Sequence, residues 1–163
     1  MTLRRVGDNE FVEEHGGDYE DFEPGMVIRH WPGRTITETD NTWLTLLTMN
    51  QHPLHFDRHY GERAEFGQVL VNSGITLCLV SGMTVQALSA RAVANLGWDK
   101  VRLEAPVFVG DTLYATSRIL DRRLSRSRPG TGIVTVETTG AKSTEEIVII
   151  FERSFMVRCR TAG

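Results

Sequence analysis

The pattern of hydrophobic and polar positions changes along the chain from helical periodicity to strand-like alternation. Apolar side chains recur at helical spacing over residues 40–49, and Thr37 stands three residues before Asp40 in an acidic variant of the pattern that starts a helix. Residues 72–95 are apolar on nearly every side. A helix of that kind must be buried on every side, so we expect a long apolar central helix there.

Shorter elements are expected around these two helices. Residues 1–20 are polar and predict an irregular lead-in. Residues 26–29 and 34–37 predict short extended pieces. Asp57 is a good N-cap, and it predicts a short helix or turn over residues 57–66.

The remainder of the chain has the features of an antiparallel sheet. Turn signals separate segments rich in β-branched residues, which we predict as extended segments at residues 101–103, 107–109, 112–121, 133–139 and 147–157. Long strands joined by short turns form an antiparallel meander. One fully apolar helix with such a meander predicts an α+β fold in which the sheet wraps around the helix.

Composition and charge indicate one ordinary globular domain. The 163 residues are enough to bury a sizeable core, and 40% of them are hydrophobic and 24% charged. We therefore predict a single domain over residues 1–163, with its core at about residues 20–158. The formal net charge of −3 gives no general attraction to nucleic acid or to anionic membranes, so neither is expected as a partner.

Cysteine usage and hydropathy predict a cytoplasmic protein. Cys78 and Cys159 are too few for a disulfide framework or a cysteine-based metal site, and we expect free thiols in a reducing compartment. Residues 1–18 are charged and lack the apolar core of a signal peptide. Polar side chains interrupt the most apolar window, residues 75–93, so no membrane span is expected.

The segment from Asn50 to Asp57 concentrates the side chains that can carry chemistry. His52 and His55 can exchange protons near neutral pH, and the amide of Asn50 can both donate and accept when it orients a water or a carbonyl group. Pro53 disfavours α geometry at the preceding residue, so the first helix should end in a loop that carries these groups.

A zinc site is the other chemistry that this segment suggests. His52, His55, Asp57 and His59 are suitable ligand types. Their short spacings around Pro53 do not resemble a common zinc motif, so no metal is predicted. Asp57 is expected to act as the N-cap of the following turn.

The same segment resembles the signature of the MaoC-like dehydratases, also called (R)-specific enoyl-CoA hydratases. That signature has the pattern Gly-Asp-x-Asn-Pro-(aliphatic)-His-x-Asp. Asn50 stands where the family has its catalytic Asp, and His52 stands where it has Asn. The residues that match the pattern are Pro53, Leu54, His55 and Asp57.

Later segments extend this resemblance to about residues 20–158. They are Phe66-Gly67, Asn72-Ser73-Gly74 before the central helix, and the run from Ala105 to Leu113. The family implies a hotdog fold, in which an antiparallel sheet wraps around the central helix. It also implies at least a homodimer, with the site at the subunit boundary.

Asn50 further resembles one branch of the family, which includes the mesaconyl-CoA hydratases (beta-methylmalyl-CoA dehydratases). In that branch the pattern Asn-x-His-x-x-His-(aromatic)-Asp is usual and activity is retained. The branch implies a hydro-lyase that reversibly hydrates a 2-enoyl-CoA, short, branched or dicarboxylic, to the 3-hydroxyacyl-CoA. Because Asn cannot act as a general base, either His55 is the sole base and Asn50 positions the water, or the activity is lost or changed.

The resemblance also implies roles around the reacting thioester. His55 would take a proton from water as the water attacks Cβ. Free N–H groups near Ser73 and Gly74, at the start of the central helix, would stabilise the enolate oxygen, with His52 and Asn72 as further substrate-binding residues. The reaction requires no metal and no redox cofactor, and CoA enters only as part of the substrate.

Other interpretations of these residues stay open. His55 could be a structural loop histidine, Asn50 could form an Asx-turn, and Gly74 could simply permit close helix–sheet contact. The arginines between Arg122 and Arg128 could be a solvated turn or a contact for CoA phosphates.

Two other functions also stay open on the same scaffold. A hotdog thioesterase usually activates water with an acidic residue, and Asn50 stands where the obvious carboxylate would be. The second is a non-catalytic acyl-CoA-binding subunit, which the absence of an Asp at position 50 keeps open.

Overall fold

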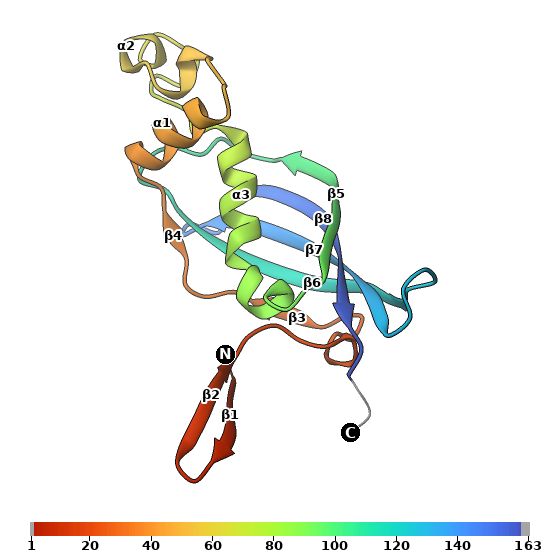
Figure 1. The fold of residues 1–163 in the computed structure, drawn as a ribbon. Helices are drawn as coiled ribbons and strands as arrows, with labels where there is room; N and C mark the ends of the chain where they lie inside the picture. Colours follow the sequence, from red (N-terminus) through yellow and green to blue (C-terminus); the bar gives the residue numbers. More distant parts are fainter. Residues whose placement is uncertain (1, 161–163) are drawn as a thin grey trace.

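The body of the protein is an antiparallel sheet that curves around one helix (Figure 1). The computed structural model describes residues 2–160. Its larger sheet has the strand order β3-β6-β7-β8-β5, and β4 also pairs with β6. The strands are β3 (Val27–Arg29), β4 (Arg34–Thr35), β5 (Ala94–Leu103), β6 (Thr112–Leu124), β7 (Thr131–Lys142) and β8 (Ile147–Arg158). Helix α3 (Ser73–Met83) lies against the face that the sheet curves around, which confirms the α+β hotdog fold.

Alternating burial explains why the sheet forms where the pattern places it. In β7 and β8 nearly every second side chain is buried, as expected for strands with one face against a core. Val134 and Val136 of β7 pack with Phe155 of β8 in one apolar cluster. Val80 of α3 and Phe151 of β8 belong to a second cluster nearer the start of the helix.

The central helix is shorter than predicted. The chain leaves α geometry after Met83, forms a π-helical turn at Val85–Ser89 (η3), and is already in strand β5 at Ala94. The prediction of helix up to residue 95 was wrong because pairing of β5 with β8 outweighs the apolar pattern, which a helix and a buried strand share.

The predicted burial of this helix on every side is not met within one chain. The α3 residues Ser73, Gly74, Cys78 and Gly82 are exposed, which leaves one face of the helix open to solvent.

Cys78 and Cys159 are free thiols, as predicted.

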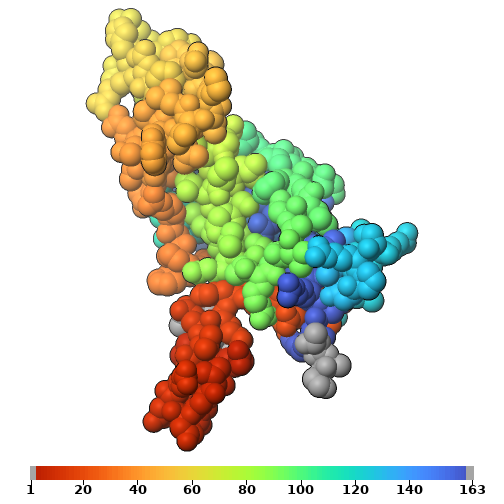
Figure 2. Space-filling view, in the orientation of Figure 1, coloured from red at the N-terminus to blue at the C-terminus, as the bar shows by residue number. Residues whose placement is uncertain are grey.

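The N-terminal segment is a hairpin rather than the irregular lead-in predicted from its polarity. Strands β1 (Thr2–Gly7) and β2 (Glu10–Glu14) pair with each other and extend away from the body, at the end opposite α1 and α2 (Figures 1 and 2). The loop between them contains Asn9 at φ 63°, a conformation that Asn tolerates in two-residue hairpin turns. Hairpin pairing satisfies the backbone without a core, so a polar composition did not exclude it.

Helix α1 (Glu38–Leu47) forms where the pattern predicts it. Thr37 is its N-cap: Oγ1 accepts from the Asp40 N–H at 3.1 Å, and Asp40 Oδ2 accepts from the Thr37 N–H at 2.8 Å. Hydrogen bonds from the Thr37 side chain and backbone lower the pKa of Asp40 from its ordinary value. This reciprocal cap fixes the start of the helix that carries the site loop.

Short elements complete the chain. The 3₁₀ turns are η1 (Tyr19–Asp21) and η2 (Pro53–His55), and α2 (Arg58–Gly61) is a single turn capped by Asp57, whose Oδ1 accepts from the Tyr60 N–H at 3.1 Å. The N-cap role predicted for Asp57 is therefore confirmed. The predicted strand at residues 107–109 is only an isolated bridge between Leu70 and Phe108.

Within residues 2–160, no helix has the length and hydropathy needed to cross a membrane.

Candidate active site

The loop that carries Asn50 begins where α1 ends. Met49 has a φ of 58°, and the Asn50 N–H turns back to donate to the Thr45 carbonyl oxygen at 3.1 Å. A residue in left-handed geometry just after the last turn is a common way to stop a helix. The chain then runs into η2, where Pro53 occupies the first helical position.

Asn50 forms the Asx-turn that was one of its two interpretations. Its Oδ1 accepts from the His52 N–H at 3.0 Å. Its Nδ2 group has no acceptor within residues 2–160, so these N–H groups remain available to a water or a substrate oxygen. The turn and a site role are therefore compatible, because they use opposite ends of the same amide.

His52 is exposed and caps the turn that contains His55. Its Nδ1 accepts from the Leu54 N–H at 3.2 Å, so the proton of the neutral ring lies on Nε2. The two imidazole centroids are 5.8 Å apart. His52 thus lies beside His55 with an N–H donor free for a ligand.

His55 is half-buried and is held by a backbone carbonyl. Its Nδ1 lies 3.0 Å from the Leu70 carbonyl oxygen, across 15 residues of sequence. Because a carbonyl can only accept, Nδ1 must carry the proton and Nε2 must carry the lone pair. A neutral imidazole in this tautomer is set up to accept a proton at Nε2.

The start of α3 differs in one detail from the expectation of free N–H groups. Asn72 is the N-cap, and its Oδ1 accepts from the Gly74 N–H at 2.9 Å, so the Gly74 N–H is not free. The Ser73 N–H has no acceptor among the described residues, and it points out of the same helix end. The Asn72 Nδ2 donates to Thr45 Oγ1 at 3.3 Å, so both ends of that amide are engaged.

The predicted residues lie on two segments that hydrogen bonds join. Asn50, His52 and His55 lie on the loop after α1, and Ser73 and Gly74 open α3. The Leu70 N–H donates to the Leu54 carbonyl at 3.0 Å, which joins the loop to the segment before α3.

Two buried polar residues of α1 were missed. Asn41 and Thr45 are the only fully buried residues of α1, and they lie one turn apart. Trp43, Leu46 and Leu47 of the same helix are exposed. The available signal was a pair of polar side chains at positions i and i+4, opposite the apolar ones. Sequence reasoning gave the apolar stripe the buried role, as in ordinary amphipathic helices.

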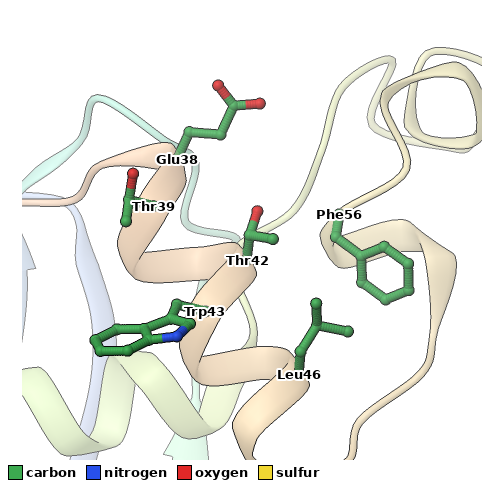
Figure 3. Close-up of a pocket in the computed structure, with 6 residues that line it drawn as sticks. All are labelled: Glu38, Thr39, Thr42, Trp43, Leu46 and Phe56. Atoms are coloured by element: carbon green, nitrogen blue, oxygen red, sulfur yellow. The ribbon is translucent and has the colours of Figure 1, made fainter.

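A cavity of about 720 Å³ lies between α1 and Phe56 (Figure 3). It is lined by Glu38, Thr39, Thr42, Trp43, Leu46 and Phe56. Figure 3 shows Phe56 and Leu46 facing each other across it. Neither His55 nor Asn50 lines this cavity, so within the single chain it does not form a substrate tunnel that ends at these two residues.

A metal site and the arginines from Arg122 to Arg128 were the other charged features that the sequence suggested. Within residues 2–160, no three His, Cys, Asp or Glu side chains cluster closely enough to hold a metal. The Arg122 guanidinium donates to the Tyr19 and Glu20 carbonyl oxygens at 3.1 and 3.0 Å. Arg123, Arg126 and Arg128 are exposed, as expected for a solvated turn.

Comparison with known proteins shows the family of this chain. A family model described as mesaconyl-CoA hydratase matches residues 1–163. The beta-methylmalyl-CoA dehydratase of Chloroflexus aurantiacus is 34% identical over 145 residues, which cover 89% of this chain and 41% of that protein. This chain spans 41–44% of the length of the four curated relatives that are more than 30% identical to it.

Solved structures give the same result for the fold. A crystal structure of a MaoC domain protein from Chloroflexus aurantiacus has a TM-score of 0.84 at 34% identity, over 90% of this chain and 41% of that one. A Mycobacterium tuberculosis protein described as a double hotdog fold has a TM-score of 0.81 at 24% identity, over 91% of this chain and 47% of that one. With a family model that covers its whole length, this chain belongs to the mesaconyl-CoA hydratase family of MaoC-like proteins.

Proposed function

We propose that this chain is a hydro-lyase that reversibly adds water to the α,β double bond of a 2-enoyl-CoA thioester, giving the 3-hydroxyacyl-CoA. The substrate we favour is short and branched or dicarboxylic, like mesaconyl-CoA. Family membership supports the reaction class. The observation that carries the proposal is the hydrogen bond from His55 Nδ1 to the Leu70 carbonyl, which leaves Nε2 as a proton acceptor.

In the proposed reaction, His55 Nε2 takes a proton from water while the water oxygen bonds to Cβ. The double-bond electrons move to the thioester carbonyl and form an enolate. The resulting imidazolium then delivers its proton to Cα, so one residue serves as base and acid and the atoms balance. The Nδ2 group of Asn50 donates to the attacking water and positions it.

The enolate oxygen needs a donor where the negative charge develops. In our proposal this donor is the Ser73 N–H, at the positive end of the eleven-residue helix α3. His52 supplies a further N–H from its exposed Nε2, while Gly74 and Asn72 shape the helix start. Water addition is balanced without electron transfer, so the proposed reaction needs no redox cofactor, and protein groups alone fill its proton-transfer and donor roles without a metal.

We also propose that the active form is at least a homodimer. Strand β5 ends the strand order, and it exposes Leu96, Trp98, Val101 and Leu103. Long apolar edges of this kind are normally covered. One chain matches about half of a double hotdog fold, so a second copy would supply the other half and, in our proposal, complete a substrate pocket at His55.

Sedimentation of matched variants tests the dimer. Trp98→Lys places a charge on the β5 edge and should shift the mass towards one chain, with loss of activity. Trp31→Lys is the control, because Trp31 is 84% exposed and lies outside β5. A wild-type protein that sediments as one chain would refute this part of the proposal.

We also propose a cytoplasmic location. The free state of both thiols supports it, because cysteines stay reduced there.

The reaction itself is tested by adding crotonyl-CoA or mesaconyl-CoA to the purified chain and following the enoyl-thioester absorbance. We expect His55→Gln to lower kcat by roughly 10²–10⁴-fold, the usual contribution of a general acid–base residue. His59→Gln, in the exposed turn of α2, is the matched control and should keep wild-type activity. Release of free CoA thiol would instead indicate a thioesterase, and tight binding without turnover would indicate a binding subunit.

A further inference from the structure

Asn41 is a buried amide at the centre of the site's hydrogen-bond network. Asn41 is 1% exposed and lies on the inner face of α1. Its Nδ2 group donates to the His55 carbonyl at 2.7 Å and to the Leu70 carbonyl at 3.2 Å. Its Oδ1 accepts from the Asn72 N–H at 3.0 Å. One side chain therefore joins three segments that are far apart in sequence.

The Leu70 carbonyl connects this network to the reacting ring. The same oxygen accepts from Asn41 Nδ2 and from His55 Nδ1, the latter at 3.0 Å. Asn41 thus holds both the backbone of His55 and the acceptor that orients its ring. A primary amide suits this position because it offers two N–H donors and an acceptor in one rigid plane.

We propose that Asn41 is the positioning residue that sets the orientation and tautomer of His55. The inference rests on the proposed hydratase function, in which His55 is the base. Asn41 is too deeply buried to touch a substrate, so it acts only through the backbone and the Leu70 carbonyl. It also holds Asn72, and so it keeps the α3 start that carries the Ser73 N–H in register with the loop.

Asn41→Asp is the sharpest substitution because it preserves shape and leaves at most one donor, the O–H of a protonated carboxyl. At least one of the two carbonyl oxygens then loses its donor and must move away. The His55 ring would lose its fixed acceptor and populate the other tautomer. Misplacing a catalytic group by about 1 Å can lower the rate roughly 100-fold, so we expect a fall in kcat of about that size with little change in KM.

Two readouts separate positioning from a loss of fold. Long-range ¹H–¹⁵N NMR of the imidazoles, assigned with His55→Gln, should show wild-type His55 protonated at Nδ1 and the Asn41→Asp variant as a mixture of tautomers. Asn41→Ala, which removes the donors without adding charge, should give the same mixture. Asn9→Asp in the exposed hairpin turn is the control for the added charge and should change neither the tautomer nor kcat.

The NMR readout does not need turnover, so it remains decisive if the chain hydrates none of the enoyl-CoA substrates. If the variants do not fold, wild-type protein still decides: Asn41 Nδ2 protons should exchange slowly and His55 should carry its proton on Nδ1. Folded variants in which His55 keeps the wild-type tautomer and kcat would overturn the proposal. So would a wild-type His55 protonated at Nε2.

Discussion

Two regions of this protein are held together in opposite ways. We call the larger sheet with α3 the sheet body, and α1 with residues 50–57 and 70–74 the site layer. The sheet body buries apolar rows such as Val134, Val136 and Phe155. The site layer buries the polar side chains Asn41 and Thr45 and exposes the apolar Trp43 of the same helix.

The difference shows that one region stabilises the fold and the other positions the side chains of the candidate site. Burial of apolar surface stabilises a fold without specifying a direction, whereas hydrogen bonds act only at defined distances and angles. In the proposed reaction His55 is the base, so its ring nitrogen must face the reacting atoms. Directional contacts from Asn41 and Leu70 provide that placement, and the sheet body supplies the stability that they require.

The largest expected effect is in the sheet body. Phe155 is fully buried and lies edge-to-face with Phe22, with ring centroids 5.8 Å apart. Phe155→Ala should lower the free energy of unfolding by about 3–5 kcal/mol, as measured in urea. Phe11→Ala is the control: this side chain is 54% exposed on the hairpin, and its loss should change stability by less than about 0.5 kcal/mol. Equal losses would mean that the apolar rows do not carry the stability.

The next effect tests the polar exception inside the sheet body. His30 is buried and hydrogen-bonded to Ser117 Oγ at 2.9 Å; burial, and then the charge of Arg153, lower its pKa from 6.5 to about 4. As the pH falls below 6.5 the unfolded chain therefore takes up this proton first. Stability from neutral His30 is complete above about pH 6.5, and about 3 kcal/mol is lost by pH 4.

Denaturation of the wild type and His30→Gln between pH 7 and pH 4 measures this contribution. The wild type should lose stability relative to His30→Gln as the pH falls, because the variant has no such proton to take up. His59→Gln, at an exposed position, is the control and should follow the wild type. Parallel wild-type and His30→Gln curves would contradict a lowered pKa.

The smallest effect in free energy is expected in the site layer. Thr45→Val keeps the shape of the side chain but leaves the Asn72 Nδ2 group without its acceptor at 3.3 Å. An unpartnered buried donor costs about 1–3 kcal/mol. Thr39→Val, exposed on the same helix, controls for helix propensity and should have no comparable effect on urea unfolding. If both variants have the same free energy of unfolding, the hydrogen bond between Asn72 and Thr45 does not stabilise the site layer.

The sheet and the first helix could be predicted because their signals are local. Alternating residues in β7 and β8 and the Thr37–Asp40 cap identify these elements without any knowledge of the tertiary structure. The end of α3 could not be predicted, because an apolar run is compatible with both helix and buried strand. The hairpin was missed for the opposite reason, since its backbone pairing requires no apolar face.

The sequence predicted candidate site residues, but it did not predict the hydrogen bonds that hold them. The motif predicts a site at His55 and Asn50, whereas the hydrogen bonds that hold these side chains involve backbone groups of Leu70 and His52. Backbone acceptors leave no mark in the sequence. Asn41 was missed because its role depends on three distant segments that meet only in the folded chain.

The most direct test of the whole account is single-substrate turnover followed by mass spectrometry. Wild-type protein mixed with mesaconyl-CoA should convert the thioester to a product that has gained the mass of one water, with CoA still attached. His55→Gln, at equal concentration and with an unchanged unfolding midpoint, should convert almost none in the same time. Equal conversion by the folded variant, or no hydrated product from the wild type, would contradict the assignment of His55 as the base of an enoyl-CoA hydratase.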